Sequence, residues 1–143
     1  MDSYNEFIHG VDAIVIGRGT YETVLSYPRW PYDQKVFLLS TSIKQVPETL
    51  IGKLTILSMQ PGDLIKYLSD NGFSNIYIDG GKVIQSFLRE DFIDEMIITR
   101  VPVLLGSGIP LFGFLDNTIE FTHIQTEVYS NGLVRSHYTR RRK

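Results

Sequence analysis

The stretch Asn75-Ile76-Tyr77-Ile78-Asp79-Gly80-Gly81-Lys82-Val83-Ile84 decides the fold of this chain. Its pattern predicts a buried strand, a two-glycine turn and the first turn of a helix. Glycines let a backbone bend sharply and approach a ligand, because they carry no Cβ. The free N–H groups at the start of the helix would favour a phosphate in the turn. The alternative interpretation is a tight strand-to-helix connection that holds no ligand.

A second stretch, Asp12-Ala13-Ile14-Val15-Ile16-Gly17-Arg18-Gly19-Thr20-Tyr21-Glu22, repeats this layout. Its turn contains Arg18, whose planar guanidinium suits phosphate oxygens, and Thr20, which we expect to cap the helix. Two such turns at the carboxyl ends of parallel strands would hold the two ends of one extended phosphate ligand. Neither turn is a strict dinucleotide fingerprint or an NTPase phosphate loop.

Length and composition indicate one globular domain over residues 1–143. The chain is 43% apolar and 21% charged, with a net charge of −2, which gives no general attraction to nucleic acid or anionic membranes. It has no cysteine, its N-terminus is no signal peptide, and no apolar run could span a bilayer. The three histidines lack metal-ligand spacing, so no metal site is expected. A cytoplasmic location without nucleic-acid or membrane partners is the default.

The order of elements predicts an α/β fold with a mixed, mostly parallel sheet and an antiparallel C-terminal hairpin. Continuous apolar runs indicate strands buried on both faces. The expected strands are Ala13–Ile16, Val36–Leu39, Leu54–Leu57, Ile76–Asp79, Ile93–Val101, Ile119–Tyr129 and Leu133–Tyr138. The expected helices cover about residues 2–9, 20–26 and 61–70, and a further one follows Gly81 and presents Val83, Ile84, Phe87 and Leu88 as its apolar face.

Two segments outside this pattern allow more than one interpretation. The loop Tyr27-Pro28-Arg29-Trp30-Pro31-Tyr32 packs its rings on the core or closes over a ligand; prolines exclude a regular helix there. The tail Arg140-Arg141-Arg142-Lys143 is predicted to be a frayed, solvated end rather than an arm that binds nucleic acid.

Four motifs together resemble the dihydrofolate-reductase-like superfamily, in its branch related to the reductase domain of bacterial riboflavin biosynthesis (the RibD C-terminal domain). They are Gly17–Glu22, Tyr77–Gly81, Ile93–Glu95 and Pro102–Phe112, in order along nearly the whole chain. The resemblance implies a three-layer α/β/α fold, an NADPH site and a homodimer. It places cofactor contacts at Gly17, Arg18, Gly19, Thr20, Leu39, Ser40, Thr41, Gly80, Gly81, Lys82, Val83 and Ile84.

The chain departs from this family at two places. Asp79 occupies a position where riboflavin-pathway reductases usually carry glutamate facing the nicotinamide; it is the candidate for a catalytic residue, and no other is singled out. Family members also begin with a central strand and a Ser-Leu-Asp-Gly-like loop, which the chain lacks. We expect that the sequence is shortened, that its start codon is misassigned, or that another segment, from a partner subunit for example, fills the gap.

Three functional hypotheses follow. The first is an NADPH-dependent reductase of a small heterocyclic or sugar-derived carbonyl or imine, related to the 5-amino-6-(5-phosphoribosylamino)uracil reductase of riboflavin biosynthesis. The second is a non-catalytic nucleotide-binding module that lost its substrate half. The third is an oligomer-forming protein with an empty cleft.

Overall fold

The computed structural model describes residues 10–141. Within this range the chain divides into two compact units. The boundary in the sequence lies between Ser86 and Phe87, and each unit is described separately. The predicted helix over residues 2–9 lies outside the described residues. No helix within residues 10–141 is both long and apolar enough to cross a membrane.

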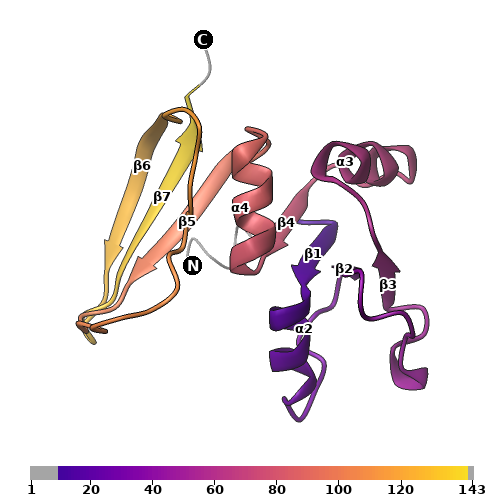
Figure 1. Ribbon diagram of the computed structural model, residues 1–143. Coiled ribbons are helices and arrows are strands. Elements are labelled where there is room, and N and C mark those ends of the chain that lie inside the picture. The colour runs from indigo at the N-terminus through magenta and orange to yellow at the C-terminus, as the bar shows by residue number, and fades with distance from the viewer. Residues whose placement is uncertain (1–9, 142–143) are drawn as a thin grey trace. The chain divides into compact units, whose positions relative to one another are not determined.

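The first unit contains a four-stranded parallel sheet with the order β3-β2-β1-β4 (Figure 1). Strand β1 is central, and its residues Ala13 to Ile16 are at most 1% exposed, as expected for a strand covered on both faces. The bounds agree with the predicted strands to within one residue. They are β1 Ala13–Gly17, β2 Lys35–Leu39, β3 Leu54–Leu57 and β4 Ile76–Asp79.

Two helices of this unit cover opposite faces of the sheet. Helix α2 (Arg18–Leu25) buries Tyr21 in the core cluster with Ile14 and Leu38, on the face to which the even-numbered residues of β1 and β2 point. On the other face, Phe37 of β2 contacts Tyr67 of α3 (Pro61–Asp70), with ring centroids 6.2 Å apart. The connection from β1 to β2 and the connection from β3 to β4 cross the sheet in opposite directions. Because both crossovers are right-handed, helices α2 and α3 lie on opposite faces.

Helix α4 (Gly81–Arg89) follows β4 after the single residue Gly80. Its predicted apolar face is confirmed at three of four positions, because Val83, Phe87 and Leu88 are buried and Ile84 is half-buried. A short 3-10 helix, η1 (Glu48–Leu50), lies between β2 and β3.

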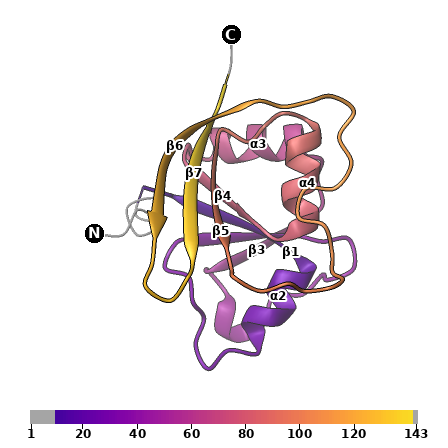
Figure 2. The same cartoon turned by 90° about the vertical axis from the view of Figure 1, so that its left-hand side faces the viewer.

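The second unit contains a three-stranded antiparallel sheet with the order β5-β7-β6 (Figure 2). Its strands are β5 Glu95–Arg100, β6 Phe121–Val128 and β7 Val134–Arg140. The turn at Asn131-Gly132 joins β6 to β7, so the predicted hairpin is confirmed. Residues 101–120 connect β5 to β6 without regular secondary structure, and they expose several large apolar side chains, including Leu104 and Ile109.

The basic tail differs from its prediction at Arg140, which is the last residue of β7 and not a frayed end. Its guanidinium forms a two-pronged ion pair with Asp91, with Nε to Oδ1 at 2.6 Å and Nη2 to Oδ2 at 2.9 Å. The Arg140 backbone N–H also donates to the Asp94 carbonyl at 2.7 Å. The hydrogen bond to the Asp94 carbonyl and the ion pair with Asp91 therefore hold Arg140 in place at the end of β7.

The fold class is confirmed, with parallel strands first and antiparallel strands last. In the described residues, hydrogen bonding groups these strands into two sheets rather than into one mixed sheet.

Candidate functional site

The carboxyl ends of β1, β2 and β4 meet at one edge of the parallel sheet. Gly17 at the end of β1 is in register with Leu39 at the end of β2, and Ile16 is in register with Asp79 of β4. A Cβ on Gly80 would stand 2.9 Å from Thr20 Oγ1 and 3.4 Å from the Gly17 nitrogen. The two glycine bends therefore lie side by side. Ligands of open α/β sheets bind outside this edge, between loops that leave neighbouring strands.

The first bend is tighter than predicted, because α2 begins directly after β1. Gly17 is the N-cap residue, Arg18 is the first helical residue and Gly19 lies in the first turn. The prediction that Thr20 caps the helix is wrong: Thr20 is inside the helix, and no side chain caps its start. Nothing lies within 4 Å of a Cβ placed on Gly19, so the backbone of this turn is approachable from outside.

Arg18 lies at the start of α2, on an exposed part of the edge. Its Nε is 2.6 Å from Glu22 Oε1, and its Nη1 donates to Ser42 Oγ at 3.5 Å. The first turn of α2 contains no acidic residue. A cation at the start of a helix opposes the helix dipole, and here the Glu22 carboxylate offsets part of the charge of Arg18.

The end of β2 forms a hydroxyl-rich turn beside Arg18. Ser40 Oγ accepts hydrogen bonds from the backbone N–H groups of Ser42 and Ile43, at 3.2 and 3.0 Å. Leu39 and Ser40 are half-buried, and Thr41 is exposed. Ser42 was not among the predicted site residues, although its hydroxyl is the one that contacts Arg18.

The second bend depends on Gly80, whose φ of +104° is a conformation that favours glycine. The N–H of Ile84 donates to the Gly80 carbonyl at 2.9 Å, which closes the first turn of α4. Gly81 and Lys82 are exposed, and nothing lies within 4 Å of a Cβ on Gly81. Val83 is instead buried, and its Cγ2 would be 2.8 Å from a Cβ on Gly17, so this side chain packs the two bends together.

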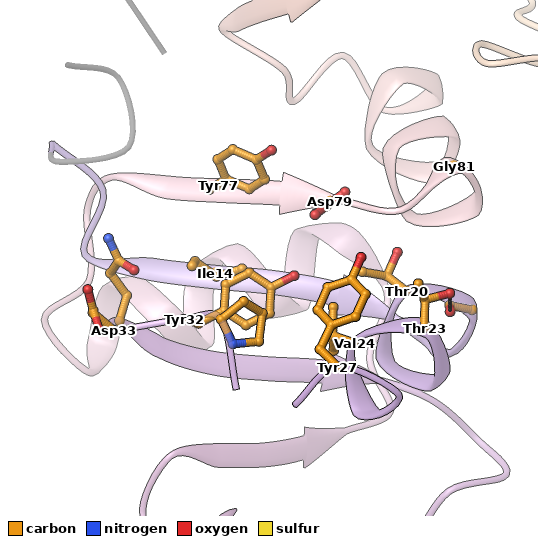
Figure 3. A pocket seen from close by; sticks show the side chains of 13 residues that line it. Ile14, Thr20, Thr23, Val24, Tyr27, Tyr32, Asp33, Tyr77, Asp79 and Gly81 are labelled. Atoms are coloured by element: carbon orange, nitrogen blue, oxygen red, sulfur yellow. Dashed lines mark hydrogen bonds between the residues drawn. The ribbon is translucent and has the colours of Figure 1, made fainter. Parts of the chain in front are cut away.

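A cavity of about 830 Å³ opens beside these bends, on the face of the sheet that α2 covers (Figure 3). Its floor is made by Ile14 of β1 and by Tyr77 and Asp79 of β4, which alternation along the strands places on one face. The lining residues are Ile14, Gly19, Thr20, Thr23, Val24, Tyr27, Pro31, Tyr32, Asp33, Gln34, Tyr77, Asp79 and Gly81.

The cavity includes some of the predicted site residues and not others. Gly19, Thr20, Asp79 and Gly81 line it. The remaining predicted residues are not part of its lining; they are Gly17, Arg18, Leu39, Ser40, Thr41, Gly80, Lys82, Val83 and Ile84. The predicted cofactor residues thus follow the edge of the sheet, and the cavity continues from this edge across the face below α2.

Asp79 is a half-buried carboxyl in the cavity wall. Burial raises its pKa above the ordinary value of 3.8, while hydrogen bonds from the Gly80 backbone N–H and the Tyr32 hydroxyl act in the opposite direction. Desolvation disfavours the charged form, so this carboxyl retains its proton to higher pH than an exposed aspartate. Perturbed carboxyl groups in cavities are candidates for functional residues.

The aromatic loop packs its rings on the core, which confirms the first of its two predicted alternatives. Trp30 and Tyr32 pack against the core cluster and contact each other edge to face, with centroids 5.4 Å apart. Tyr27, Pro31 and Tyr32 also line the cavity. The contact of Tyr32 with Asp79 could not be predicted from sequence, because the loop has no periodicity that would indicate which ring faces the sheet.

No group of three or more metal-ligating side chains occurs within residues 10–141.

Comparisons with known proteins give the family context of this geometry. Residues 24–135 match the model of the RibD C-terminal domain. The chain is 35% identical to the uncharacterized protein YwjB of Bacillus subtilis (strain 168) over 142 residues, which cover 97% of this chain and 79% of the relative.

Solved structures agree with this assignment. A Shewanella sp. PV-4 protein, provisionally named for riboflavin biosynthesis, superposes with a TM-score of 0.92 at 42% identity, over 99% of this chain and 81% of that one. A Thermotoga maritima diaminohydroxyphosphoribosylaminopyrimidine deaminase/5-amino-6-(5-phosphoribosylamino)uracil reductase superposes with a TM-score of 0.73 over 98% of this chain and 49% of that one. At 14% identity this second likeness shows the fold alone.

Proposed function

Because the chain belongs to the family of RibD C-terminal domains, we propose that it is an NADPH-dependent reductase of a small heterocyclic or sugar-derived substrate. The reaction class is that of the 5-amino-6-(5-phosphoribosylamino)uracil reductases. A hydride would be added to a carbonyl or imine carbon, together with a proton on the heteroatom.

The observation that supports this proposal is the contact between the two glycine bends. Gly80 lies against Thr20 and Gly17, so the starts of α2 and α4 are next to each other. Each start presents backbone N–H groups and a partial positive charge. Two such starts side by side suit a ligand that contains more than one phosphate group.

The residues present at these bends fit NADPH. Gly19 and Gly81 leave open space where other residues would have a Cβ, so a pyrophosphate could approach the backbone at both helix starts. Arg18 is the cation for a 2′-phosphate, and Leu39, Ser40 and Thr41 border the adjoining region that we assign to the adenosine. NADPH supplies the hydride when it is bound, and the protein supplies binding and orientation.

Asp79 is our candidate for the group that holds the proton. Its carboxyl lies in the cavity wall, accepts a hydrogen bond from Tyr32 and has a raised pKa because of burial. A carboxyl with a raised pKa takes up a proton more readily than an exposed aspartate, so Asp79 can be ionised while a ligand binds and still deliver a proton during the transfer. Tyr32 orients the carboxyl through this hydrogen bond.

Titration with NADPH and NADH tests the proposal. We expect NADPH to raise the melting temperature more than NADH, because a ligand that binds only the folded state stabilises it. Calorimetry gives the two affinities, and loss of reduced-nicotinamide absorbance with a panel of heterocyclic carbonyls and imines reports turnover. Binding without oxidation of NADPH would favour the non-catalytic module, and absence of any thermal shift would contradict a nicotinamide cofactor.

A further inference from the structure

The charged side chains in the lining of the cavity beside the bends are all acidic. Of its thirteen lining residues, none is lysine, arginine or histidine, and two, Asp33 and Asp79, are acidic. A phosphate group placed in this cavity would face carboxylates and no cation of its lining. Like charges brought together in a binding site reduce affinity strongly.

Three basic residues of this unit are likewise absent from the lining. Arg18, at the start of α2, pairs with Glu22 and reaches Ser42 beyond the end of β2. Lys35, at the start of β2, donates to the Gly52 carbonyl at 3.4 Å. Lys82 is exposed and is not part of the lining. Apart from the helix starts at Gly19 and Gly81, which we assign to the cofactor pyrophosphate, the lining of the cavity offers no cationic group to a phosphate.

The polar groups of the cavity suit a flat ring that donates hydrogen bonds. Tyr27, Tyr32 and Tyr77 contribute three aromatic rings to its wall, and rings of this kind pack against planar ligands (Figure 3). The Asp79 carboxylate accepts hydrogen bonds from Tyr32 and the Gly80 N–H. A carboxylate has about four acceptor positions, so capacity for N–H donors of a ligand remains.

We propose that this cavity binds an unphosphorylated planar nitrogen heterocycle, neutral or cationic, through N–H donors to Asp79, and that it discriminates against phosphorylated substrates. This inference rests on the proposed reductase function, since it names the substrate class of the same site. It separates this chain from reductases that act on a ribose phosphate, because the charge of the lining opposes such a group.

A matched pair of ligands tests the charge selection. Cytidine and cytidine 5′-monophosphate share one ring and one exocyclic amine and differ by a phosphate, and 2,4-diaminopyrimidine is a smaller ring with two amines. Each is titrated into the whole chain with NADP⁺ present, so that the sheet edge is occupied, and is followed by NMR shifts and by quenching of tyrosine fluorescence. We expect cytidine to bind at least about tenfold more tightly than the monophosphate. Equal or tighter binding of the monophosphate would overturn the inference.

Asp79→Asn identifies the carboxylate as the source of the selection. The variant retains an oxygen that accepts from Tyr32 but removes the charge, so 2,4-diaminopyrimidine should bind about tenfold more weakly and the difference between the cytidine pair should shrink. Asp70→Asn, which changes an exposed carboxylate of α3 outside the cavity, is the matched control and should change neither value. Unchanged ligand affinities in Asp79→Asn, with the melting temperature showing a folded protein, would refute the role of Asp79.

The same data separate this inference from the proposed function. If NADPH and NADP⁺ do not bind but the ring ligands are still discriminated by charge, the cofactor proposal fails and the inference stands. If NADPH binds while none of the ring ligands is bound at millimolar concentration, the inference fails and the cofactor proposal stands.

Discussion

The backbone of Gly80 lies so close to Thr20 that a Cβ on the glycine would stand 2.9 Å from the threonine Oγ1. Gly80 also has a φ of +104°, which residues with a side chain rarely adopt. We therefore expect Gly80→Ala to lower the free energy of unfolding by about 1–3 kcal/mol, as measured by urea denaturation. It should also weaken NADPH binding, because the bend that positions the start of α4 is displaced.

Gly81→Ala is the matched control for this substitution. A Cβ on Gly81 would have no atom within 4 Å, and Gly81 is the first residue of α4. Replacing it by alanine should stabilise the protein by about 0.4–1 kcal/mol, because the unfolded chain loses freedom. If the two alanine variants were equally stable, the close approach of Gly80 to Thr20 would not constrain the fold.

Arg18 should determine the preference for NADPH over NADH. Arg18→Ala removes the guanidinium at the start of α2, so NADPH affinity should fall at least about tenfold, while NADH affinity stays nearly constant. Glu22→Ala removes the carboxylate that pairs with Arg18 at 2.6 Å and should leave NADPH affinity unchanged or increased. Calorimetric titrations of both variants measure these affinities. If Arg18→Ala lost affinity for NADPH and for NADH to the same extent, this would count against a 2′-phosphate site at Arg18.

The raised pKa of Asp79 should appear in the pH dependence of stability. A carboxyl whose folded pKa exceeds its unfolded value binds more protons when folded, so its contribution to unfolding free energy falls as pH rises from about 3.8 through the folded pKa. Asparagine does not titrate, so the unfolding free energy of Asp79→Asn does not contain this pH-dependent loss. The unfolding free energy of the variant relative to the parent should therefore increase across this window, as measured by urea denaturation at several pH values.

Other titratable groups in the cavity are Asp33 and the tyrosines, and the Asp79→Asn comparison keeps all of them constant. A difference between variant and parent that did not change with pH would show that burial does not perturb this carboxyl.

The ion pair between Asp91 and Arg140 should stabilise the second unit. Asp91 has a φ of +58°, and its carboxylate contacts Arg140 through two hydrogen bonds, of 2.6 and 2.9 Å. Asparagine also tolerates this backbone conformation but removes the charge, so Asp91→Asn should lower the melting temperature. Asp91→Ala should lower it further, because alanine disfavours this φ. Asp70→Ala, which removes the exposed Lys66–Asp70 pair, should have little effect. Equal effects of Asp91→Asn and Asp70→Ala would mean that the bidentate geometry adds nothing.

We also predict that the chain is a homodimer, with residues 101–115 at the contact. This segment contains no charged residue, and Leu104 and Ile109 are 100% and 92% exposed. Apolar exposure of this kind marks interaction surfaces. Light scattering should give twice the mass of one chain, and Leu104→Glu combined with Ile109→Glu should give monomers. Ile51→Glu, at another exposed apolar position, should not, and a monomeric parent protein would contradict the prediction.

The sequence predicted the parallel strands and the position of both bends well because each depends on local information. Apolar runs such as Ala13–Ile16 indicate strands, and paired glycines such as Gly80-Gly81 indicate sharp turns. The start of α2 was misplaced because Thr20 is a good capping residue by type, and only the direct passage from β1 into the helix puts it inside.

Contacts across long sequence separations could not be predicted in this way. Tyr32 meets Asp79 because the loop after α2 folds back over the face of the sheet, and no local pattern encodes that path. The prediction for Arg140 was wrong for the same reason. Its partner Asp91 lies 49 residues earlier in the chain, before β5 and β6. The cavity itself results from such contacts, so the local patterns predicted the edge of the sheet and only four of the lining residues.

The packing of Val83 under Gly17 has a consequence for how relatives of this protein can diverge. A methyl group at position 17 would meet Val83 Cγ2 at 2.8 Å, so Gly17 cannot gain a side chain unless Val83 moves or becomes smaller. Homologues that have acquired alanine at position 17 should therefore carry a smaller residue at position 83, and the two sites should covary as a pair.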